Sequence, residues 1–344
     1  MESRAREWIK ADESAKEMLS RVLIHFVLPP PLHTFPFRPG NVVEVVGPTP
    51  SAKTHILMQA AIRCILPKEW NGVCYGGLDH VVMFIDLDCR FDILHFSRLL
   101  EHQIRIAQGL KFNEEMGKNE ADSAKYILKK DSLGGNVKSL TSMCLRRFFY
   151  VRCYNSLQFL ATLKTMHMQI QERKENHGIG VHVLMIDSIG AFYWTDRALS
   201  SLSLGDVNRK GLSLQAVSEI VVEEIRKLLK LHRVLILTTK TVNLQDRFLT
   251  HEIKSAPSKV FSEDTSCSRA TRSKPQNIPY REYMPFVWQN FVTHRVLIRP
   301  SDDEIQNPPI FSSEWLLPLL NTIERFTAGD HGTLTVPSRC IGKN

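Results

Sequence analysis

The sequence predicts an α/β fold with a mostly parallel central sheet flanked by helices, for two reasons. Apolar runs of strand length, of the kind that is buried on both faces of a parallel sheet, recur along the chain. Helical patterns separate these runs, as crossover connections between parallel strands require. The apolar runs are Val42–Val46, Val81–Asp86, Phe148–Val151, Val181–Asp187 and Val234–Thr239.

The first two runs each lead into a predicted helix. A helical pattern covers residues 53–66 and stops before Pro67, because a residue that precedes proline is disfavoured in a helix. Residues 67–79 are polar and glycine-rich, and we expect a loop there. After Val81–Asp86, an apolar stripe predicts another helix: Leu94, Leu99, Leu100 and Ile104.

The second half of the chain repeats this alternation of strand and helix. The runs that begin at Phe148, Val181 and Val234 are expected to form buried strands. Helices are expected between them, at residues 156–173 and 214–231. Two closing strands are expected after them: Pro285–Phe291 and His294–Arg299.

We expect a single domain over residues 41–320. Residues 1–40 are predicted to form a short helical segment and a proline-rich linker, and residues 321–344 a C-terminal tail with little pattern. Within the domain, residues 105–141 are expected to be a surface insertion and residues 243–283 a long basic loop.

Composition limits the class of protein. The formal net charge of +8 over 344 residues permits contact with nucleic acid without establishing it. No apolar run approaches the ~20 residues of a membrane span, and the N-terminus lacks a signal-peptide pattern, so we expect a soluble intracellular protein with no membrane partner. The seven cysteines include no CxxC pair and are expected to be reduced, buried thiols rather than zinc ligands.

The stretch between the first apolar run and the first helical pattern has the context of a phosphate-binding P-loop. Backbone N–H groups at the helix start would cradle the phosphates of ATP. Lys53 would reach the terminal phosphates, and Thr54 would ligate Mg²⁺. The candidate cofactor-binding residues are therefore Gly47, Pro48, Thr49, Pro50, Ser51, Ala52, Lys53 and Thr54.

This stretch departs from the usual G-x-x-x-x-G-K-[ST] pattern. Ala52 replaces the glycine before the lysine, and Pro50 removes an N–H and stiffens the loop. If position 52 requires a positive φ, alanine costs about 1–2 kcal/mol, which is about 5- to 30-fold in affinity. We expect weakened nucleotide binding, and a chance strand–turn–helix connection is the alternative.

Acidic residues end two further predicted strands. Asp187 closes an apolar run in the manner of a Walker B strand, whose carboxylate positions Mg²⁺ through its water shell; an ordinary turn aspartate is the alternative. Asp86 and Asp88 end the run before it, and Asp88 is the candidate catalytic group that activates water. Its alternative role is to cap the helix that begins near Asp92. The carboxyl ends of parallel strands would bring these groups to the P-loop.

Several segments together resemble RecA-type recombinases. Residues 187–196 resemble their Walker B segment, which reads D-S-x-x-A-L-Y-R-T-D in eukaryotic members, and Ile85–Asp88 resembles their I-D-T-E. Leu237–Val242 stands where they have I-T-N-Q-V. Two later segments resemble their closing strands: Trp288–Asn290 and Arg295–Leu297. The resemblance covers roughly residues 40–300 and implies a RecA-like P-loop NTPase core.

The branch that this chain resembles best is the recombinase paralogues, through residues 63–68, 91–94, 100–102 and 187–194. That resemblance implies a nuclear protein in homologous-recombination repair of DNA double-strand breaks. It also implies ATP and Mg²⁺ as cofactors, other RecA-like paralogues as partners, and single-stranded or branched DNA as a ligand within the complex. An autonomous DNA-stimulated ATPase is the alternative.

Two departures from the recombinases bear on hydrolysis. Asp88 stands where they keep a catalytic glutamate, and its shorter stem draws the carboxylate back by about 1.5 Å; a misplacement of about 1 Å can cost ~10²-fold in rate. Lys240 stands where they have the glutamine that senses the γ-phosphate, and it could meet phosphate as a point charge. We expect a site that holds nucleotide but hydrolyses it poorly, so that any ATPase activity is weak and DNA-dependent.

In RecA-type recombinases two loops face DNA. The resemblance implies that the corresponding loops of this chain, at about residues 195–213 and 243–283, do the same. The second is basic, which suits contacts to the backbone of single-stranded DNA, and a solvated loop in a basic protein is the alternative. It contains few aromatic residues for base stacking: Phe248, Phe261, Tyr280 and Tyr283.

Overall fold

The structure is a computed structural model that describes residues 25–109, 135–177, 180–202, 213–244, 280–301, 308–329 and 332–336. Several predicted features lie wholly or mostly outside these residues. They are the N-terminal helix, the centre of the 105–141 insertion, the second half of the 195–213 loop and the interior of the 243–283 basic loop.

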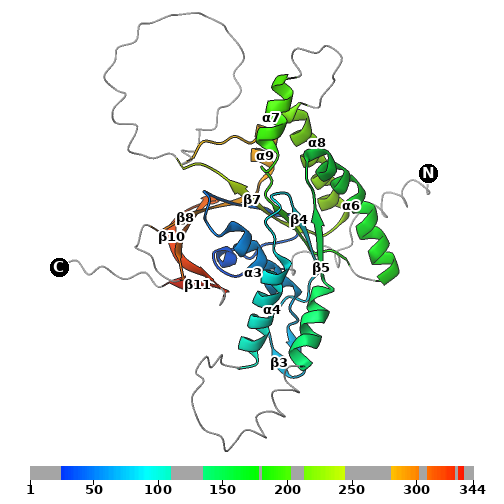
Figure 1. Ribbon diagram of the computed structural model, residues 1–344, viewed down its shortest axis with the longest axis vertical. Helices are drawn as coiled ribbons and strands as arrows, with labels where there is room; N and C mark the ends of the chain where they lie inside the picture. The colour runs from blue at the N-terminus through cyan, green and yellow to red at the C-terminus, as the bar shows by residue number, and fades with distance from the viewer. Residues whose placement is uncertain are drawn as a thin grey trace, which may run out of the picture.

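The described residues form a nine-stranded sheet in the order β11-β10-β9-β8-β1-β7-β6-β4-β5 (Figure 1). The strands from β8 to β5 in this order pair in parallel, and β9, β10 and β11 continue the sheet as antiparallel strands. The predicted α/β fold with a mostly parallel sheet is therefore confirmed. The parallel strands are β1 (Val42–Gly47), β4 (Val82–Asp86), β5 (Phe148–Arg152), β6 (Val183–Asp187), β7 (Leu235–Thr241) and β8 (His294–Pro300). The antiparallel strands are β9 (Ile310–Leu317), β10 (Leu319–Gly329) and β11 (Gly332–Val336).

Helices cover both faces of the parallel strands (Figure 1). One face packs against α3 (Lys53–Ile65), α4 (Ile93–Ala107) and a helix over residues 135–145. The other packs against α6 (Ser156–His177), α8 (Leu214–Leu231) and α9 (Phe286–Phe291). Successive strand residues point to opposite faces, so Val43 belongs to the first core and Val42 to the second. Burial of both faces explains why these strands are continuously apolar.

Smaller elements complete the described chain. They are the 3₁₀ helix η1 (Leu32–Thr34), the two-stranded hairpin of β2 (Glu69–Trp70) and β3 (Val73–Cys74), and α7 (Tyr193–Leu202). The hairpin occupies part of the predicted 67–79 loop, and α7 occupies the start of the predicted 195–213 loop.

The prediction of a closing strand at Pro285–Phe291 is wrong, because this segment is the short helix α9. Its aromatic and β-branched residues favour a strand in isolation. In a strand, however, Phe286 and Trp288 would share one face, whereas the structure buries Trp288 and leaves Phe286 72% exposed. A helix places Phe286 and Trp288 on different faces, so it can bury the Trp288 indole while Phe286 stays exposed.

The sheet and its core extend beyond several predicted boundaries. β10 and β11 pair within residues 321–336, where the sequence predicted a tail. In the predicted linker, Phe26 and Phe37 are fully buried in the first core. The end of the predicted 105–141 insertion is also core, because Leu140 of the helix over 135–145 is fully buried there. Each of these segments buries only one side, so its apolar pattern is weaker than that of a central strand.

Three of the cysteines in the described ranges are buried as expected: Cys64, Cys144 and Cys153. Cys74 and Cys89 are exposed, contrary to the expectation of buried thiols.

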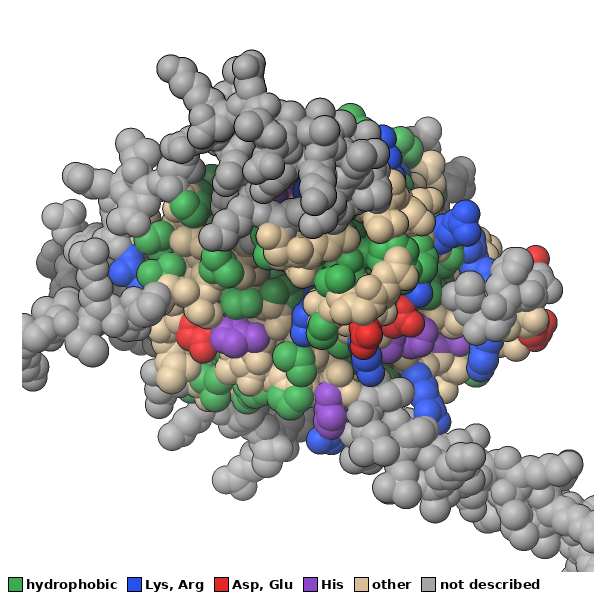
Figure 2. All heavy atoms as spheres, turned by 90° about the horizontal axis from the view of Figure 1, so that it is seen from below, with side chains coloured by type: hydrophobic (Ala, Val, Ile, Leu, Met, Phe, Trp, Pro, Cys, Tyr) green, Lys and Arg blue, Asp and Glu red, His purple; other side chains and the backbone are tan. Residues whose placement is uncertain are grey.

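Within the described ranges, none of the helices combines the length and the hydropathy that crossing a bilayer requires. The face shown in Figure 2 carries basic, acidic, histidine and hydrophobic side chains intermixed, so the net positive charge is not gathered into one patch among its described residues.

Candidate nucleotide site

The loop between β1 and α3 is built around a glycine. A Cβ on Gly47 would lie 2.6 Å from both the Ile298 carbonyl oxygen and Ser51 Oγ, so a larger residue would displace the loop or the neighbouring strand. The loop ends where α3 begins, at Lys53. Because the first N–H groups of a helix lack intrahelical acceptors, this end of α3 offers donors and a positive dipole to an anion.

Ala52 adopts the left-handed conformation, with φ 57° and ψ 16°. The condition that the sequence left open, a positive φ at position 52, therefore holds in the structure. An alanine in this region costs about 1–2 kcal/mol, which a glycine would not incur. The chain therefore turns into α3 through a left-handed residue although no glycine stands at this position.

Lys53 is held inside the loop. Its Nζ donates hydrogen bonds to the carbonyl oxygens of Gly47 (3.0 Å) and Pro48 (2.7 Å) and to Ser51 Oγ (3.1 Å). Burial lowers the pKa of Lys53 to about 8, although the nearby carboxylates of Asp187 and Asp88 oppose this fall. The ammonium group thus lies among the loop residues that would surround a phosphate.

Thr54 joins the loop to the strand that ends in Asp187. Thr54 Oγ1 donates to Asp187 Oδ2 at 2.6 Å, and Thr239 Oγ1 donates to the other carboxylate oxygen. Burial raises the pKa of Asp187, whereas the two hydroxyl donors act in the opposite direction. The structure therefore brings together the two predicted Mg²⁺-binding residues, which lie 133 positions apart in the sequence.

Asp88 faces the same site from the turn after β4. Its backbone N–H donates to the carbonyl oxygen of Asp187 at 3.2 Å, and its side chain is half-buried. The alternative role of Asp88 as a helix cap is excluded, because Asp92 caps α4 and accepts from the N–H groups of Leu94 (2.8 Å) and His95 (3.3 Å). Asp88 thus remains a candidate for contact with water or substrate.

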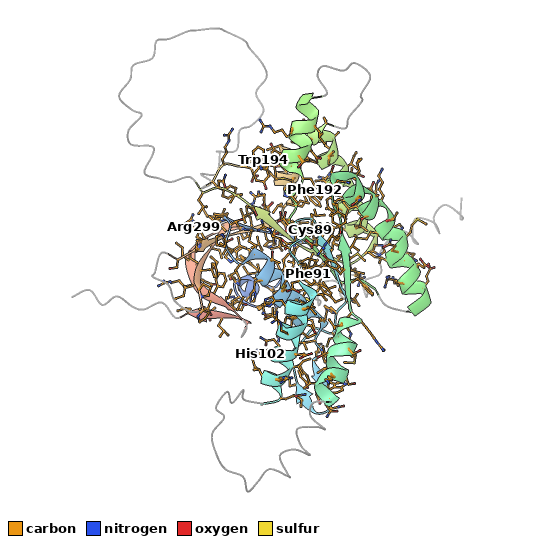
Figure 3. The ribbon with its side chains drawn as sticks, viewed as in Figure 1. Cys89, Phe91, His102, Phe192, Trp194 and Arg299 are labelled. Atoms are coloured by element: carbon orange, nitrogen blue, oxygen red, sulfur yellow. The ribbon has the colours of Figure 1, made fainter. Side chains whose placement is uncertain are left out.

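Asp86 has a structural role instead. It is fully buried and accepts hydrogen bonds from Tyr150 Oη (2.8 Å) and from the N–H groups of Arg90 and Phe91 (3.3 Å each). Arg152 Nε lies 3.4 Å from the same carboxylate. These contacts fix the turn that positions Asp88. Figure 3 labels Cys89 and Phe91 of this turn, which lies near the middle of the molecule.

An open cavity of about 320 Å³ lies between these groups, within the usual size range of small-molecule sites. Most of the predicted site residues line it: Thr49, Pro50, Ser51, Ala52, Lys53, Thr54, Asp88 and Asp187. The hydroxyl and carboxylate oxygens among them are the ligand types that Mg²⁺ prefers, so the donor set fits MgATP. Gly47 and Pro48 do not line the cavity, but their carbonyl oxygens accept hydrogen bonds from Lys53 and so hold its ammonium group in the site.

Other residues that line the cavity were not among the predicted site residues: His55, Met58, Arg90, His95 and Thr241. Arg90 and His95 follow Asp88 in the turn and the first turn of α4, so the same strand end that indicated Asp88 could have indicated them. Arg90 adds a second positive charge beside Lys53, which balances the two carboxylates.

Lys240 does not line the cavity; its neighbour Thr241 does. The Lys240 side chain is fully buried, with Nζ 2.7 Å from Glu282 Oε2 and 3.2 Å from Glu44 Oε2. Two carboxylates thus hold the ammonium inside the core, outside the cavity. The predicted contact of Lys240 with nucleotide phosphate is corrected accordingly, and Lys240 has a structural role in the described chain. Neither Glu44 nor Glu282 was singled out from the sequence, since a lone glutamate carries no signal of its distant partner.

Glu44 is the centre of this buried ionic cluster. It accepts hydrogen bonds from Trp288 Nε1 (2.8 Å) and Arg295 Nε (2.6 Å) in addition to its pairing with Lys240. Burial alone would raise the pKa of Glu44, but the two cations and the indole donor hold it below its ordinary value. The carboxylate is therefore ionised inside the core and ties β1 to β7, β8 and α9.

Comparison with known proteins identifies the family. The chain is 48% identical to a DNA repair protein XRCC2 homolog of Arabidopsis thaliana over 341 residues, which cover 96% of this chain and 90% of that protein. The chain belongs to the XRCC2 family. It is also 27% identical to the DNA repair protein XRCC2 of Mus musculus over 266 residues, which cover 77% of this chain and 74% of that protein. No known protein-family model matches the chain.

The XRCC2 match agrees with the resemblance found in the sequence, and the mostly parallel sheet is consistent with a RecA-like core. The match to the Arabidopsis XRCC2 homolog covers 96% of the chain, so it is not confined to one segment of the fold.

Proposed function

We propose that this member of the XRCC2 family of DNA repair proteins binds MgATP at the loop formed by residues 47–54 and acts as a RecA-like subunit in homologous-recombination repair. The observation that carries the nucleotide site is the 2.6 Å hydrogen bond between Thr54 Oγ1 and Asp187 Oδ2. It unites the two side chains that a P-loop and a Walker B strand would contribute to one Mg²⁺ ion.

The residues of the loop would each have a distinct role. Lys53 would place its ammonium against the terminal phosphates, and the N–H groups at the start of α3 would surround the phosphate oxygens. Thr54 and Asp187 would hold Mg²⁺ directly and through water. The bound metal would supply the positive charge that the phosphates require, because Asp88 and Asp187 already balance Lys53 and Arg90.

We further propose that hydrolysis is slow. Asp88 lies in the cavity but carries a shorter side chain than the glutamate of recombinases. Lys240 is engaged by Glu282 and Glu44, so it does not supply a mobile polar group to the phosphates. Steady-state ATP turnover with and without DNA would test this proposal. Turnover that DNA stimulates to the rates of a dedicated ATPase would favour the autonomous enzyme instead.

The resemblance also supports action in the nucleus within a complex of other recombinase paralogues, with DNA as a shared ligand. This part of the proposal predicts that the tagged chain co-purifies with such paralogues from nuclear extract. Isolation as a stable monomer that associates with none of the co-expressed paralogues would contradict it.

The deciding experiment is an equilibrium titration of the purified chain with ATP and Mg²⁺. We expect wild type to bind and Lys53→Ala to lose binding. Lys227→Ala is a matched control, because Lys227 lies on α8 and pairs with Glu224 outside the cavity. Unchanged thermal unfolding of Lys53→Ala would show that the variant is folded. Equal affinity of wild type and Lys53→Ala would overturn the site.

A further inference from the structure

Arg90 lines the nucleotide cavity on the side away from the loop at residues 47–54. The loop follows β1, whereas Arg90 follows β4, and β7 and β6 lie between these two strands in the sheet. The Arg90 side chain is exposed, and its guanidinium has neither a hydrogen-bond partner nor an ion-pair partner among the described residues. The cavity thus holds a cation whose donors are not engaged by the protein.

The backbone that carries this cation is fixed. The N–H groups of Arg90 and Phe91 donate to the fully buried carboxylate of Asp86, at 3.3 Å each. The Phe91 ring packs in the core, with its centroid 4.8 Å from that of Phe84 and 5.0 Å from that of Tyr150. The base of the Arg90 side chain is therefore anchored beside the cavity.

The turn after β4 brings Arg90 to the same cavity as Asp88, the candidate group for activating water. Cys89, which stands between them and is labelled in Figure 3, is exposed, has a left-handed φ of 56° and does not line the cavity. A left-handed residue other than glycine is uncommon and marks a constrained turn. A phosphate that reacts near Asp88 would also lie near Arg90.

The charge of Arg90 reaches the ammonium of Lys53. Burial is the main reason that the pKa of Lys53 is lowered to about 8, and the carboxylates of Asp187 and Asp88 oppose this fall. The Arg90 guanidinium acts in the same direction as burial, because two positive charges that face one cavity repel each other. An anion in contact with both cations would offset this repulsion.

The residue types in the cavity suit a phosphate at this position better than a base. None of the described residues that line the cavity is phenylalanine, tyrosine or tryptophan, whose flat faces would stack on a base. A guanidinium carries a planar fork of donors that matches two phosphate oxygens. The Lys53 ammonium already donates to three acceptors of the loop, so Arg90 is the cation with unused donors.

We propose that Arg90 contacts the terminal phosphate of bound ATP, and that this contact makes the site prefer the triphosphate to the diphosphate. The inference rests on the proposed function and adds to it a residue that determines nucleotide specificity. The loop at residues 47–54 would hold the phosphates that ATP and ADP share. Arg90 would hold the phosphate that distinguishes them.

The test is a calorimetric titration of the full chain with Mg²⁺ and either ATP or ADP. We expect Arg90→Gln to weaken ATP binding by about 10- to 150-fold, the range for loss of a hydrogen bond to a charged group. ADP binding should weaken by less than about fivefold, because ADP loses only a longer-range attraction to a surface charge. The ratio of the two affinities is the readout, since damage to the loop would weaken both nucleotides alike.

Two control variants and a probe without a base sharpen this test. Arg98→Gln removes an exposed arginine of α4 that does not line the cavity, and it should leave both affinities unchanged. Arg90→Lys keeps the charge but loses the planar fork, so its ratio of affinities should lie between those of wild type and Arg90→Gln. Magnesium tripolyphosphate should lose affinity in Arg90→Gln as ATP does. An unchanged affinity for tripolyphosphate would assign Arg90 to the base and overturn the phosphate contact.

A wild-type ratio of ATP to ADP affinity in a folded Arg90→Gln variant would also overturn the inference, whether both affinities fall or neither does. Thermal unfolding checks the fold of this variant and should be unchanged, because the side chain is exposed. Loss of ATP binding in Lys53→Ala, together with an unchanged ratio in Arg90→Gln, would retain the nucleotide site and reject the role of Arg90. Absence of ATP binding by wild type would reject both.

Discussion

Lys240 on β7 places its Nζ 2.7 Å from Glu282 Oε2, and thereby joins a strand beside the loop at residues 47–54 to the segment at residues 280–284. Glu44 shares the ammonium at 3.2 Å, and the side chains of Lys240 and Glu44 are fully buried. Lys240, the residue before the cavity residue Thr241, therefore forms internal ion pairs and does not face the cavity. The link between β7 and residues 280–284 is therefore an ion pair between the Lys240 and Glu282 side chains.

Removal of one member of this cluster should destabilise the fold strongly. We expect Lys240→Met to lower the free energy of unfolding by about 3–5 kcal/mol, because Glu282 and Glu44 would lose a buried partner. Urea denaturation measures this change. The half-exposed pair of Lys227 and Glu224 (3.0 Å) is the control, and Lys227→Met should change stability by less than about 1 kcal/mol. Similar effects of the two substitutions would contradict a buried ionic role for Lys240.

The left-handed conformation of Ala52 leads to a second prediction. Ala52→Gly should raise the free energy of unfolding by up to about 1 kcal/mol, since glycine avoids the steric cost but loses more chain entropy on folding. Because the folded loop already holds Ala52 in this conformation, we expect the gain in stability rather than in ATP affinity, and this replaces the weaker nucleotide binding that the sequence predicted. Thermal unfolding and ATP titration of the same variant distinguish the two. A destabilised Ala52→Gly would show that alanine is not strained here.

The hydroxyl of Thr54 should matter for the metal rather than for the fold. We expect Thr54→Ala to weaken Mg²⁺-dependent ATP binding by about tenfold or more, because the metal would lose a hydroxyl ligand, a contact comparable to a hydrogen bond to a charged group of about 1.5–3 kcal/mol. Thr54→Ser keeps the hydroxyl and should bind nearly as wild type. The measurement is ATP titration with Mg²⁺ and with EDTA. Equal loss of affinity in EDTA for wild type and Thr54→Ala would argue that Thr54 is not a metal ligand.

Acid should destabilise the protein through a half-buried imidazole pair. The rings of His80 and His182 stack at 4.4 Å, and burial lowers the pKa of His80 to about 4 from an ordinary value of 6.5. The unfolded chain therefore binds a proton at His80 before the folded chain does, so stability is lost as the pH falls from about 6.5 toward 4.

The His80→Phe variant tests this pH dependence, because it keeps the aromatic contact with Phe26 and removes the titrating group. We expect the decrease in unfolding free energy between about pH 7 and about pH 4.5 to be smaller than in wild type. Urea denaturation over a pH series provides the measurement. Parallel curves for the two proteins would mean that His80 does not contribute to acid sensitivity.

The parallel sheet could be predicted from the sequence because its strands are buried on both faces. Such strands read as uninterrupted apolar runs, as in Val183–Asp187. The strand β10 was missed because its burial alternates: Phe326 is buried within a stretch of polar neighbours. The helix α9 was missed because six residues are too few to display a helical period.

Within the candidate site, residues fixed by a local pattern were the ones that could be predicted. Lys53 and Thr54 follow from the loop, and Asp187 follows from the end of an apolar strand. The surroundings of Lys240 could not be predicted in this way. Its partner Glu282 lies 42 residues away in the sequence, and only the fold brings the two together.

The position of β1 in the sheet has a consequence for biosynthesis. β1 is the first strand of the sheet along the chain, yet it lies between β7 and β8, so Val45 faces Thr239 on one side and Val296 on the other. A growing polypeptide therefore exposes both edges of a valine-rich strand until most of the chain has been synthesised. Pairings over such sequence separations form slowly and leave nascent strands open to aggregation. Successful production of this protein should thus depend on chaperones or on slow translation more than on the final stability of the fold.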